Sequence, residues 1–305
     1  MKQISTVLGK ISEAELGVVL PHEHIFCYFE YFQAMLGSRY LDKETLIHQS
    51  AKHLREIKEA YRLGTIVDCT PINLGRDLDV LKRVSEESEV HIISAAGFYY
   101  TEEAVLDMFS EEAITEILLT DVENSHAGVL KFAVEAETMS KLSEKLLAAI
   151  CSVQKETALP LIIHTNAKNQ NGRAVLQAVL AHGVSPKALT LGHLSDTDDL
   201  DYVTELAKSG CYLGFDRIYK SSRAEYYAQK AEHIRTLCER GFADQLLLSH
   251  DGLTFNGLHE NATIREDNPY ALIFERLLPV LQNQLQKTEI DKLLTQNPQN
   301  MLLCQ

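Results

Sequence analysis

Two histidines stand two positions apart at the end of an apolar run near the beginning of the chain. The run Val18–Leu20 is followed by Pro21, His22, Glu23 and His24. Because residues two apart on a strand face the same way, both imidazoles can point to one side while Glu23 points to the other. Such a pair supplies half of a metal site, although a pair of hydrogen-bonded core histidines would show the same pattern.

Three later apolar runs also end in residues that can bind a metal ion. One ends at His164, another at His193, and a third at His250 and Asp251. Burying so many polar groups without partners would cost several kcal/mol, and metal coordination would remove that cost. The predicted ligands are His22, His24, His164, His193 and Asp251.

A further apolar run, Val129–Ala133, contains Lys131, which is unusual for a lysine. As an ammonium group, Lys131 would be repelled by metal ions. Burial lowers the pKa of a lysine, however, and the neutral amine can react with carbon dioxide to form a carbamate. A carbamate is a carboxylate that can bridge two ions. Spacing alone leaves open that Lys131 extends to the mouth of the barrel or pairs with a nearby acid.

The elements that must position these residues alternate along the chain. Eight short apolar runs are separated by amphipathic segments, and the runs are Val18–Leu20, Ile66–Cys69, Val90–Ala95, Val129–Ala133, Leu159–His164, Ala188–His193, Cys211–Phe215 and Gln245–His250. Alternating strands and helices predict parallel strands with right-handed crossovers. Eight units favour an α/β fold of the (β/α)8 TIM barrel type over a doubly wound sheet, since no G-x-G-x-x-G motif follows the first strand. Such a barrel carries its chemistry at the C-terminal ends of its strands.

Three of the intervening segments have clear helical spacing. Apolar residues in Glu44–Leu63 recur at three- and four-residue steps, and Gly64 is the predicted C-cap. Lys141–Thr157 and Asp198–Ser209 have similar spacing, and Gly210 follows the second.

Length and composition are those of one globular domain. The 305 residues are 45% hydrophobic and 24% charged, and no linker or low-complexity tract divides them, so we expect a single domain over 1–305. The net charge of −14, from 29 Lys+Arg and 43 Asp+Glu, disfavours binding to nucleic acid or to an anionic membrane surface. The expected partner is a small-molecule substrate.

The sequence shows neither a membrane span nor a secretory signal. No stretch approaches the roughly 18 apolar residues of a membrane span, and the start of the chain lacks the charged and apolar regions of a secretory signal. Six cysteines are scattered singly, as is typical of reduced thiols. We expect a cytoplasmic protein.

The motifs together resemble the phosphotriesterase family of the amidohydrolase superfamily. The similar stretches run in order over nearly the whole chain and are Thr6–Gly9, Leu16–Gly17, Pro21–His24, Ala127–Lys131, Ile163–Ala167, Gly192–Asp199, Ser249–Asp251 and Asn297–Pro298. The resemblance implies a hydrolase with a binuclear metal site at the strand ends.

The resemblance also assigns the ligands. His22, His24 and Asp251 would hold the more buried ion, and His164 and His193 the more exposed one. Carboxylated Lys131 would bridge them together with a hydroxide. Two divalent ions are therefore implied: zinc is the first expectation, and such ligands also accept manganese, cobalt or iron. Homodimers are common in the family, so a homodimer is possible.

Two aspartates are predicted to move protons. Asp251 can both bind metal and act as general base or acid. Asp196 resembles the family's proton-relay aspartate, but Asp196-Thr197-Asp198 also suits the start of a helix. No G-x-S-x-G elbow is seen, so no side-chain nucleophile is expected.

Substrate-binding residues are predicted from the loops. By resemblance, Tyr99 after strand three and Arg217 after strand seven indicate the lactonase branch, with Tyr100 as the alternative to Tyr99. Arg217 could orient the substrate or hold a loop. Lys220 and Arg223 could receive a phosphate or carboxylate, or could be solvated residues at a helix start.

We therefore expect a hydrolase that opens lactone rings and has weak organophosphate triesterase activity. The alternatives on the same site are an amide or carboxyl-ester hydrolase and a phosphotriesterase proper. The alternative of another class is a barrel that binds a small ligand without catalysis. The loop 252–268 has few large apolar residues, which gives only mild support for a channel that takes a long acyl chain.

Overall fold

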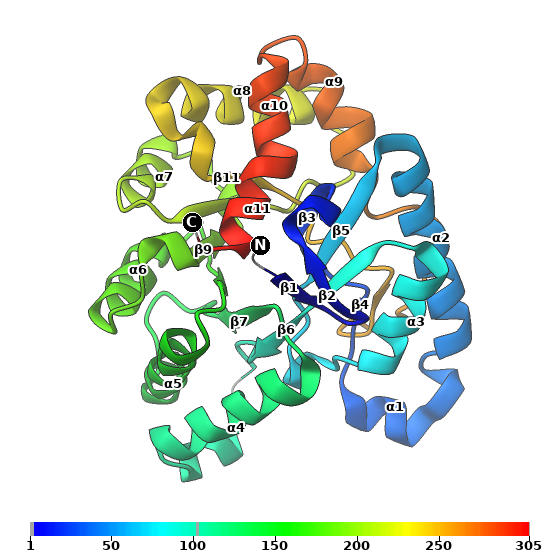
Figure 1. Ribbon diagram of the computed structural model, residues 1–305, viewed down its shortest axis with the longest axis vertical. Coiled ribbons are helices and arrows are strands. Elements are labelled where there is room, and N and C mark those ends of the chain that lie inside the picture. Colours follow the sequence, from blue (N-terminus) through cyan, green and yellow to red (C-terminus); the bar gives the residue numbers. More distant parts are fainter. Residues whose placement is uncertain (1–2, 102–103, 305) are drawn as a thin grey trace.

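The eight predicted strands form one parallel sheet that curves into a barrel (Figure 1). The computed structural model describes residues 3–101 and 104–304. In barrel order the strands are β3 (Val18–Glu23), β5 (Leu63–Asp68), β6 (His91–Gly97), β7 (Val129–Ala133), β8 (Leu161–His164), β9 (Leu189–Gly192), β10 (Tyr212–Phe215) and β11 (Leu246–Leu248). The prediction of a (β/α)8 TIM barrel is confirmed.

The barrel closes between β3 and the segment that follows β11. The backbone N–H of Asp251 donates to the carbonyl of His22 at 3.1 Å, and that of His24 donates to the carbonyl of Gly252 at 2.9 Å. The hydroxyl of Ser249 accepts from the backbone N–H of His22 at 2.8 Å. Three predicted metal ligands therefore lie on the seam that joins the first and last strands.

Helices surround the barrel and cover its outer face (Figure 1). They are α1 (Glu30–Leu36), α2 (Lys43–Tyr61), α3 (Leu78–Ser88), α4 (Glu111–Ser125), α5 (Lys141–Thr157), α6 (Gly172–Ala181), α7 (Leu200–Ala207), α8 (Tyr226–Leu237), α9 (Leu278–Leu281), α10 (Lys287–Asp291) and α11 (Asn297–Leu302). The three helices with clear spacing are found as α2, α5 and α7. The predicted cap at Gly64 is wrong: α2 ends at Tyr61, its C-cap is Arg62 with φ +63°, and Gly64 belongs to β5.

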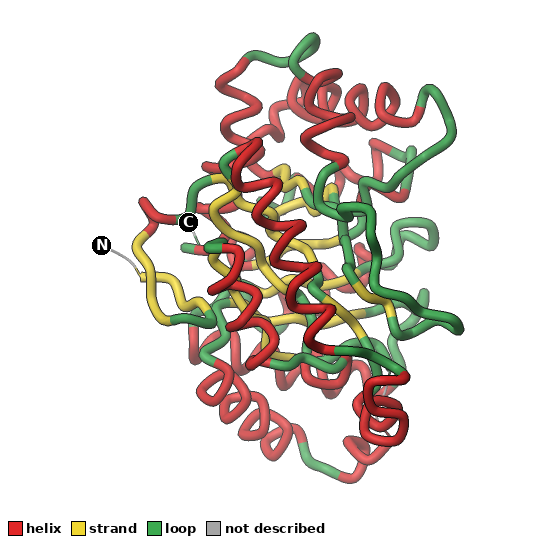
Figure 2. Tube along the Cα trace, turned by 90° about the vertical axis from the view of Figure 1, so that its right-hand side faces the viewer, coloured by secondary structure: helices red, strands yellow, loops and turns green. Residues whose placement is uncertain are grey.

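A hairpin and the last helix fill the N-terminal end of the barrel. The antiparallel strands β1 (Gln3–Thr6) and β2 (Gly9–Ser12) lie there beside α11 (Figure 1). Their apolar side chains join those inside the barrel in one cluster, made of Ile4, Ile11, Leu16, Val19, Val67, Cys69, Ile93, Ala95, Val129, Ile162, Tyr212, Leu247, Met301, Leu302 and Leu303. The termini lie at this end and long loops lie at the other (Figure 2). A larger apolar cluster packs between strands and helices.

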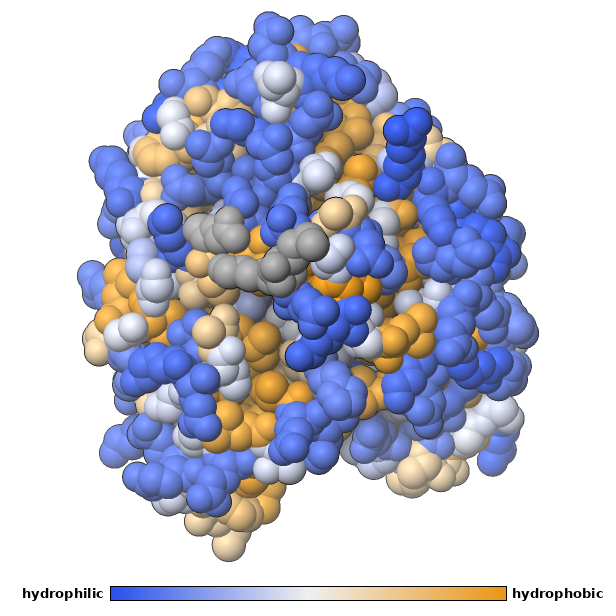
Figure 3. Space-filling view, in the orientation of Figure 1, coloured by the Kyte–Doolittle hydropathy of each residue, from blue (hydrophilic) through white to orange (hydrophobic). Residues whose placement is uncertain are grey.

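The face that carries the hairpin and α11 is mainly hydrophilic, with smaller apolar areas between charged side chains (Figure 3). In the described ranges, no helix has both the length and the apolar character needed to cross a membrane. The six cysteines form no disulfide there.

Candidate metal centre

Strand alternation explains why Lys131 and His164 point into the barrel. Val129 on β7 and Ile162 on β8 belong to the interior cluster, and each lies two residues before the polar residue. Because side chains alternate along a strand, Lys131 and His164 take the same inward side. The apolar neighbours that precede them fill the barrel below the site.

On strand β3, an irregularity is needed to point the histidines into the barrel. Val19 is interior and Leu20 belongs to the outer cluster, so strict alternation would turn His22 outward. The register of β3 against β5 shifts between Leu20 and Glu23. This bulge reverses the alternation and turns His22 and His24 inward, as predicted.

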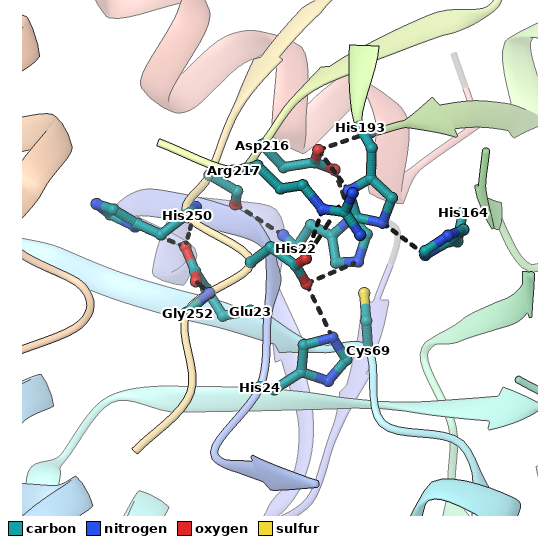
Figure 4. Close-up of polar contacts among 12 residues, drawn as sticks. His22, Glu23, His24, Cys69, His164, His193, Asp216, Arg217, His250 and Gly252 are labelled. Carbon is teal, nitrogen blue, oxygen red and sulfur yellow. Dashed lines mark hydrogen bonds and ion pairs between the residues drawn. The ribbon is translucent and has the colours of Figure 1, made fainter. Parts of the chain in front are cut away.

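The predicted ligands meet at one place at the strand ends (Figure 4). Nζ of Lys131 lies 2.7 Å from Nε2 of His22, and Nε2 of His24 lies 3.2 Å from Oδ1 of Asp251. Nδ1 of His164 lies 2.8 Å from Nε2 of His193. Ligand atoms of His22, His193 and Asp251 all lie within 4.8 Å of one another.

Three residues of the site have a left-handed backbone. His193, Arg217 and Asp251 follow β9, β10 and β11, and their φ angles are +66°, +67° and +52°. Such conformations cost non-glycine residues roughly 1–3 kcal/mol each and concentrate at functional sites. The strand ends are therefore bent so that these side chains reach the centre.

Asp216 lies between two of the histidines and orients both (Figure 4). Its Oδ2 accepts from Nδ1 of His22 at 2.6 Å, and its Oδ1 accepts from Nδ1 of His193 at 2.8 Å and from the backbone N–H of His193 at 2.6 Å. Burial alone would raise the pKa of Asp216, but His193 and His22 hold it far below its usual value. Because each Nδ1 donates to this carboxylate, each Nε2 keeps its lone pair for the centre.

Two glycines leave room for the Asp216 carboxylate. A Cβ added at Gly214 would lie 2.9 Å from Oδ2 of Asp216, and one added at Gly192 would lie 3.2 Å from it. The sequence analysis did not identify Asp216 as a partner of the histidines. The available signal was a glycine at or near the end of two neighbouring strands: Gly192 directly precedes His193, and Gly214 lies two residues before Asp216.

The other two histidines also have orienting partners. Nδ1 of His24 lies 2.8 Å from the hydroxyl of Thr70. Nε2 of His164 lies 2.7 Å from Oε2 of Glu135, which the sequence prediction did not include. Each predicted histidine ligand is thus bound at its second ring nitrogen, as metal-binding histidines almost always are.

Glu23 points away from the centre, as predicted. It accepts from the ring Nδ1 and the backbone N–H of His250 and from the backbone N–H of Gly252, each at 2.8 Å. His250 therefore supports the seam of the barrel and does not belong to the ligand cluster.

The chemistry of the donor set fits divalent metal ions. Burial, the largest influence, lowers the pKa of His22, His164 and His193, so that these imidazoles are neutral, the form that binds a metal. His24 differs: burial would lower its pKa, but Cys27 and Asp251 raise it to about 10. Metal binding at His24 would release that proton.

Arg217 lies between the two predicted proton-transfer aspartates. Its Nε donates to Oδ2 of Asp251 at 3.0 Å, and its Nη1 donates to Oδ2 of Asp196 at 2.7 Å. Asp196 does not cap the following helix, which was the alternative prediction. Asp199 caps α7 instead, accepting from the backbone N–H of Tyr202 at 2.9 Å.

A cavity of about 560 Å³ opens above the ligand cluster. Its walls include the ligands together with Cys27, Phe29, Leu74, Tyr99, Tyr100, Thr101, Arg217, Tyr219, Leu253, Asn256, Leu258 and His259. The rings of Tyr99 and Tyr100 each lie 5.7 Å from that of His164. Both alternatives for the predicted tyrosine therefore line the cavity.

The structure does not bring Lys220 and Arg223 into this cavity. The Lys220 side chain is 77% exposed and lies 4.0 Å from Asp267, and Arg223 lies 3.4 Å from Glu225. Both line a separate hollow beside α8. The loop turns outward after Tyr219, because its charged side chains find solvent and acidic partners there.

Comparison with known proteins identifies the family of this chain. Residues 2–302 match the model of the phosphotriesterase family. The chain belongs to the phosphotriesterase family. It is similar to an aryldialkylphosphatase of Saccharolobus solfataricus (28% identity over 257 residues, 80% of each chain). It is also similar to an N-acetyltaurine hydrolase of Salmo salar (27% identity over 344 residues, 98% of this chain and 97% of the relative).

A solved structure extends the likeness to the fold. The phosphotriesterase from Mycobacterium tuberculosis superposes with a TM-score of 0.89 at 26% identity, covering 99% of this chain and 98% of that one. The two named relatives are hydrolases by name. Family and fold thus agree with a hydrolase site at the strand ends.

Proposed function

We propose that this protein is a metal-dependent hydrolase that opens lactone rings at a binuclear centre. His22, His24 and Asp251 would hold one ion, His164 and His193 the other, with Lys131 as the bridging carbamate. When bound, two divalent ions, zinc first among the candidates, supply a nucleophilic water at neutral pH and polarise the carbonyl that is attacked.

The surroundings of Lys131 support the carbamate. Its side chain is 1% exposed, and Nζ contacts Nε2 of His22. Among the ion pairs of the described residues, none joins Lys131 to an acid, so the alternative of a neighbouring carboxylate finds no support. The amine of Lys131 therefore lies buried beside a proposed ligand and apart from the acids of these ion pairs, in the position that a bridging carbamate would need.

Asp251 would move the proton. One of its oxygens faces His24, and the other is held by Arg217. From this position it would take a proton from the attacking water and return it to the departing alkoxide. Arg217 cannot pass a proton on, because a guanidinium stays protonated in proteins. We therefore propose that Asp196 holds Arg217 in place, as the alternative to the predicted relay.

The presence of Tyr99 and Arg217 in one cavity is the observation that carries the lactone proposal. By resemblance, these two residues are the ones that indicate the lactonase branch of the family. The described residues that line the cavity include one lysine, Lys131, and one arginine, Arg217. Lys131 is the proposed bridge, and Arg217 already binds the carboxylates of Asp251 and Asp196, so neither is free to bind an anionic substrate. A neutral substrate such as a lactone suits this lining, and its ring opening needs one attack and one proton transfer.

Amide hydrolysis is the second candidate, because a relative that spans nearly the whole chain is named N-acetyltaurine hydrolase. Amide cleavage demands stronger protonation of the leaving nitrogen, so it would depend more steeply on Asp251.

A substrate panel distinguishes these candidates. The protein, reconstituted with zinc or manganese and bicarbonate, would be given γ- and δ-lactones, acyl-homoserine lactones, sugar lactones with and without phosphate, N-acyl amides and a paraoxon-type triester. Turnover of the lactones and the triester would be followed by proton release with a pH indicator. Turnover of the amides would be followed by chromatographic detection of the released amine, because amide hydrolysis at neutral pH releases no net proton. We expect lactones to exceed the triester and the amides. Cleavage of amides or triesters with no lactone turnover would overturn the lactone assignment.

Two variants test the assigned chemistry. Asp251→Asn removes the proton carrier and is expected to lower kcat roughly 10²–10⁴-fold, and His164→Ala to abolish most turnover. Circular dichroism would establish that both remain folded. Full activity in Asp251→Asn would contradict the mechanism.

A further inference from the structure

A second cavity adjoins the metal-binding cavity on the other side of Tyr99 and Tyr100. It measures about 350 Å³ and lies where the loop after β7 meets the first turns of α5. Its lining residues are Tyr99, Tyr100, Phe132, Ala133, Val134, Glu135, Ala136, Thr138, Met139, Ser140, Ser143 and Leu146.

The walls of this cavity are mainly apolar. Phe132 of β7, Val134 directly after that strand and Leu146 of α5 all belong to the outer apolar cluster. Glu135 is the one charged side chain among the described lining residues, and its carboxylate accepts from Asn166 at 2.8 Å and contacts His164. A carboxylate at the rim disfavours an anionic ligand, so the cavity suits a neutral apolar group.

The two tyrosines connect this cavity to the chemistry. Their rings lie 4.2 Å apart, and both pack against the ring of His164, a proposed metal ligand. They line both cavities, so that the apolar cavity borders the metal-binding cavity along these two rings.

We propose that this cavity binds an apolar substituent of the substrate while the scissile bond lies beside His164. This inference rests on the proposed hydrolase function and adds a specificity site to it. A cavity of 350 Å³ exceeds by more than twofold the roughly 150 Å³ that holds a benzene molecule in an apolar protein interior. It therefore accommodates a substituent of about the size of a hexyl chain.

The location differs from the one that the sequence suggested. A chain-binding channel was sought in the loop 252–268, whose contribution to the metal-binding cavity mixes Leu253 and Leu258 with Asn256 and His259. The more apolar space lies across the mouth of the barrel, on the side of β7 and α5. The occupant we infer is a neutral apolar group reaching over Tyr99 and Tyr100 to that side.

A matched pair of lactones tests the inference. The ratio of kcat/KM for γ-hexyl-γ-butyrolactone to that for γ-butyrolactone is the quantity measured. Burial of each methylene group is worth about a fourfold gain, so we expect a ratio well above ten. Ala136→Trp, at the exposed rim of the cavity, is expected to bring the ratio close to one. Ala224→Trp, at another exposed alanine that lines the hollow beside α8, is the control and should leave the ratio unchanged.

Two results would overturn the inference: equal turnover of both lactones by the unsubstituted protein, or an equal fall of the ratio in both tryptophan variants. Failure of the subsite must be distinguished from failure of the lactone proposal. Calorimetry would therefore measure the binding of 2-pyrrolidinone and its 5-hexyl derivative, two lactams that do not depend on lactone turnover. If no lactone is cleaved but the hexyl lactam binds at least tenfold more tightly, and Ala136→Trp removes the difference, the apolar subsite stands without the lactonase. Lactone turnover with equal lactam affinities would leave the lactonase without this subsite.

Discussion

At the scale of single residues, each histidine that is a proposed metal ligand is also held by a second contact at its other ring nitrogen. His22 and His193 share the carboxylate of Asp216, His164 contacts Glu135, and His24 contacts Thr70. The donors themselves were predictable, because they end apolar strands. The groups behind them were not, since a carboxylate after a strand looks the same in sequence whether it binds a histidine or faces solvent.

The shared carboxylate is the most informative residue to change. Asp216→Asn keeps the shape but replaces one acceptor oxygen by a donor, so one histidine loses its orienting bond. We expect metal affinity to fall roughly 10–100-fold. Competition with a chromogenic chelator would measure the affinity. Asp199→Asn, which preserves the helix cap of α7, is the control, and an equal affinity in the two variants would refute the role of Asp216.

Arg217 and Asp196 are expected to act as one unit. If Asp196 works only by holding Arg217, then Asp196→Ala and Arg217→Ala should be strongly non-additive in kcat. The double variant would be no slower than Arg217→Ala alone. Steady-state kinetics of the four proteins would measure this coupling, and additive losses would show that Asp196 has a separate role, such as proton relay.

At the scale of elements, the strands could be read from apolar runs because each is buried on both faces. The β-hairpin at the N-terminal end could not, since its strands mix polar, exposed residues with single buried apolar ones and form no apolar run. The end of α2 was placed at Gly64, although Arg62 takes the left-handed cap. Gly64 is needed within β5 because a Cβ there would overlap the carbonyl of Leu16, a contact that local sequence does not reveal.

The prediction at the scale of elements concerns the close packing of β6 against β7 at Gly97. Gly97 ends β6 with φ +139°, and a Cβ there would overlap the carbonyl oxygen of Lys131. Gly97→Ala should therefore push β6 and β7 apart and destabilise the fold by roughly 1–3 kcal/mol. Gly210→Ala, with φ +90° and nothing within 4 Å of the added Cβ, is the control for backbone strain alone. Urea unfolding compares the two, and equal losses would exclude the clash.

At the scale of the whole molecule, the metal centre and the closure of the barrel coincide. The seam bonds join His22 and His24 to the segment that carries Asp251 and Gly252. The remaining ligands come from three strands across the barrel. Length and alternation were enough to predict eight units, but the register shift of β3 that turns its histidines inward depends on packing against β5.

Metal removal should therefore weaken the entire fold. An ion that binds the native state at a free concentration of a thousand times Kd stabilises it by about 4 kcal/mol. We expect the Tm to fall when a chelator is added and to recover when zinc is restored. Scanning calorimetry would measure both steps, and a Tm that is the same with and without metal would show that the centre does not support the seam.

The most direct test of a binuclear lactone hydrolase measures bound metal and lactone turnover on the same sample. Protein loaded with zinc in bicarbonate and freed of excess metal would be assayed for zinc per chain and for kcat. We expect about two ions per chain, activity that rises in step with the ions restored, and loss of both in Lys131→Ala. Full activity in metal-free protein, or unchanged metal content and activity in Lys131→Ala, would contradict the bridged centre.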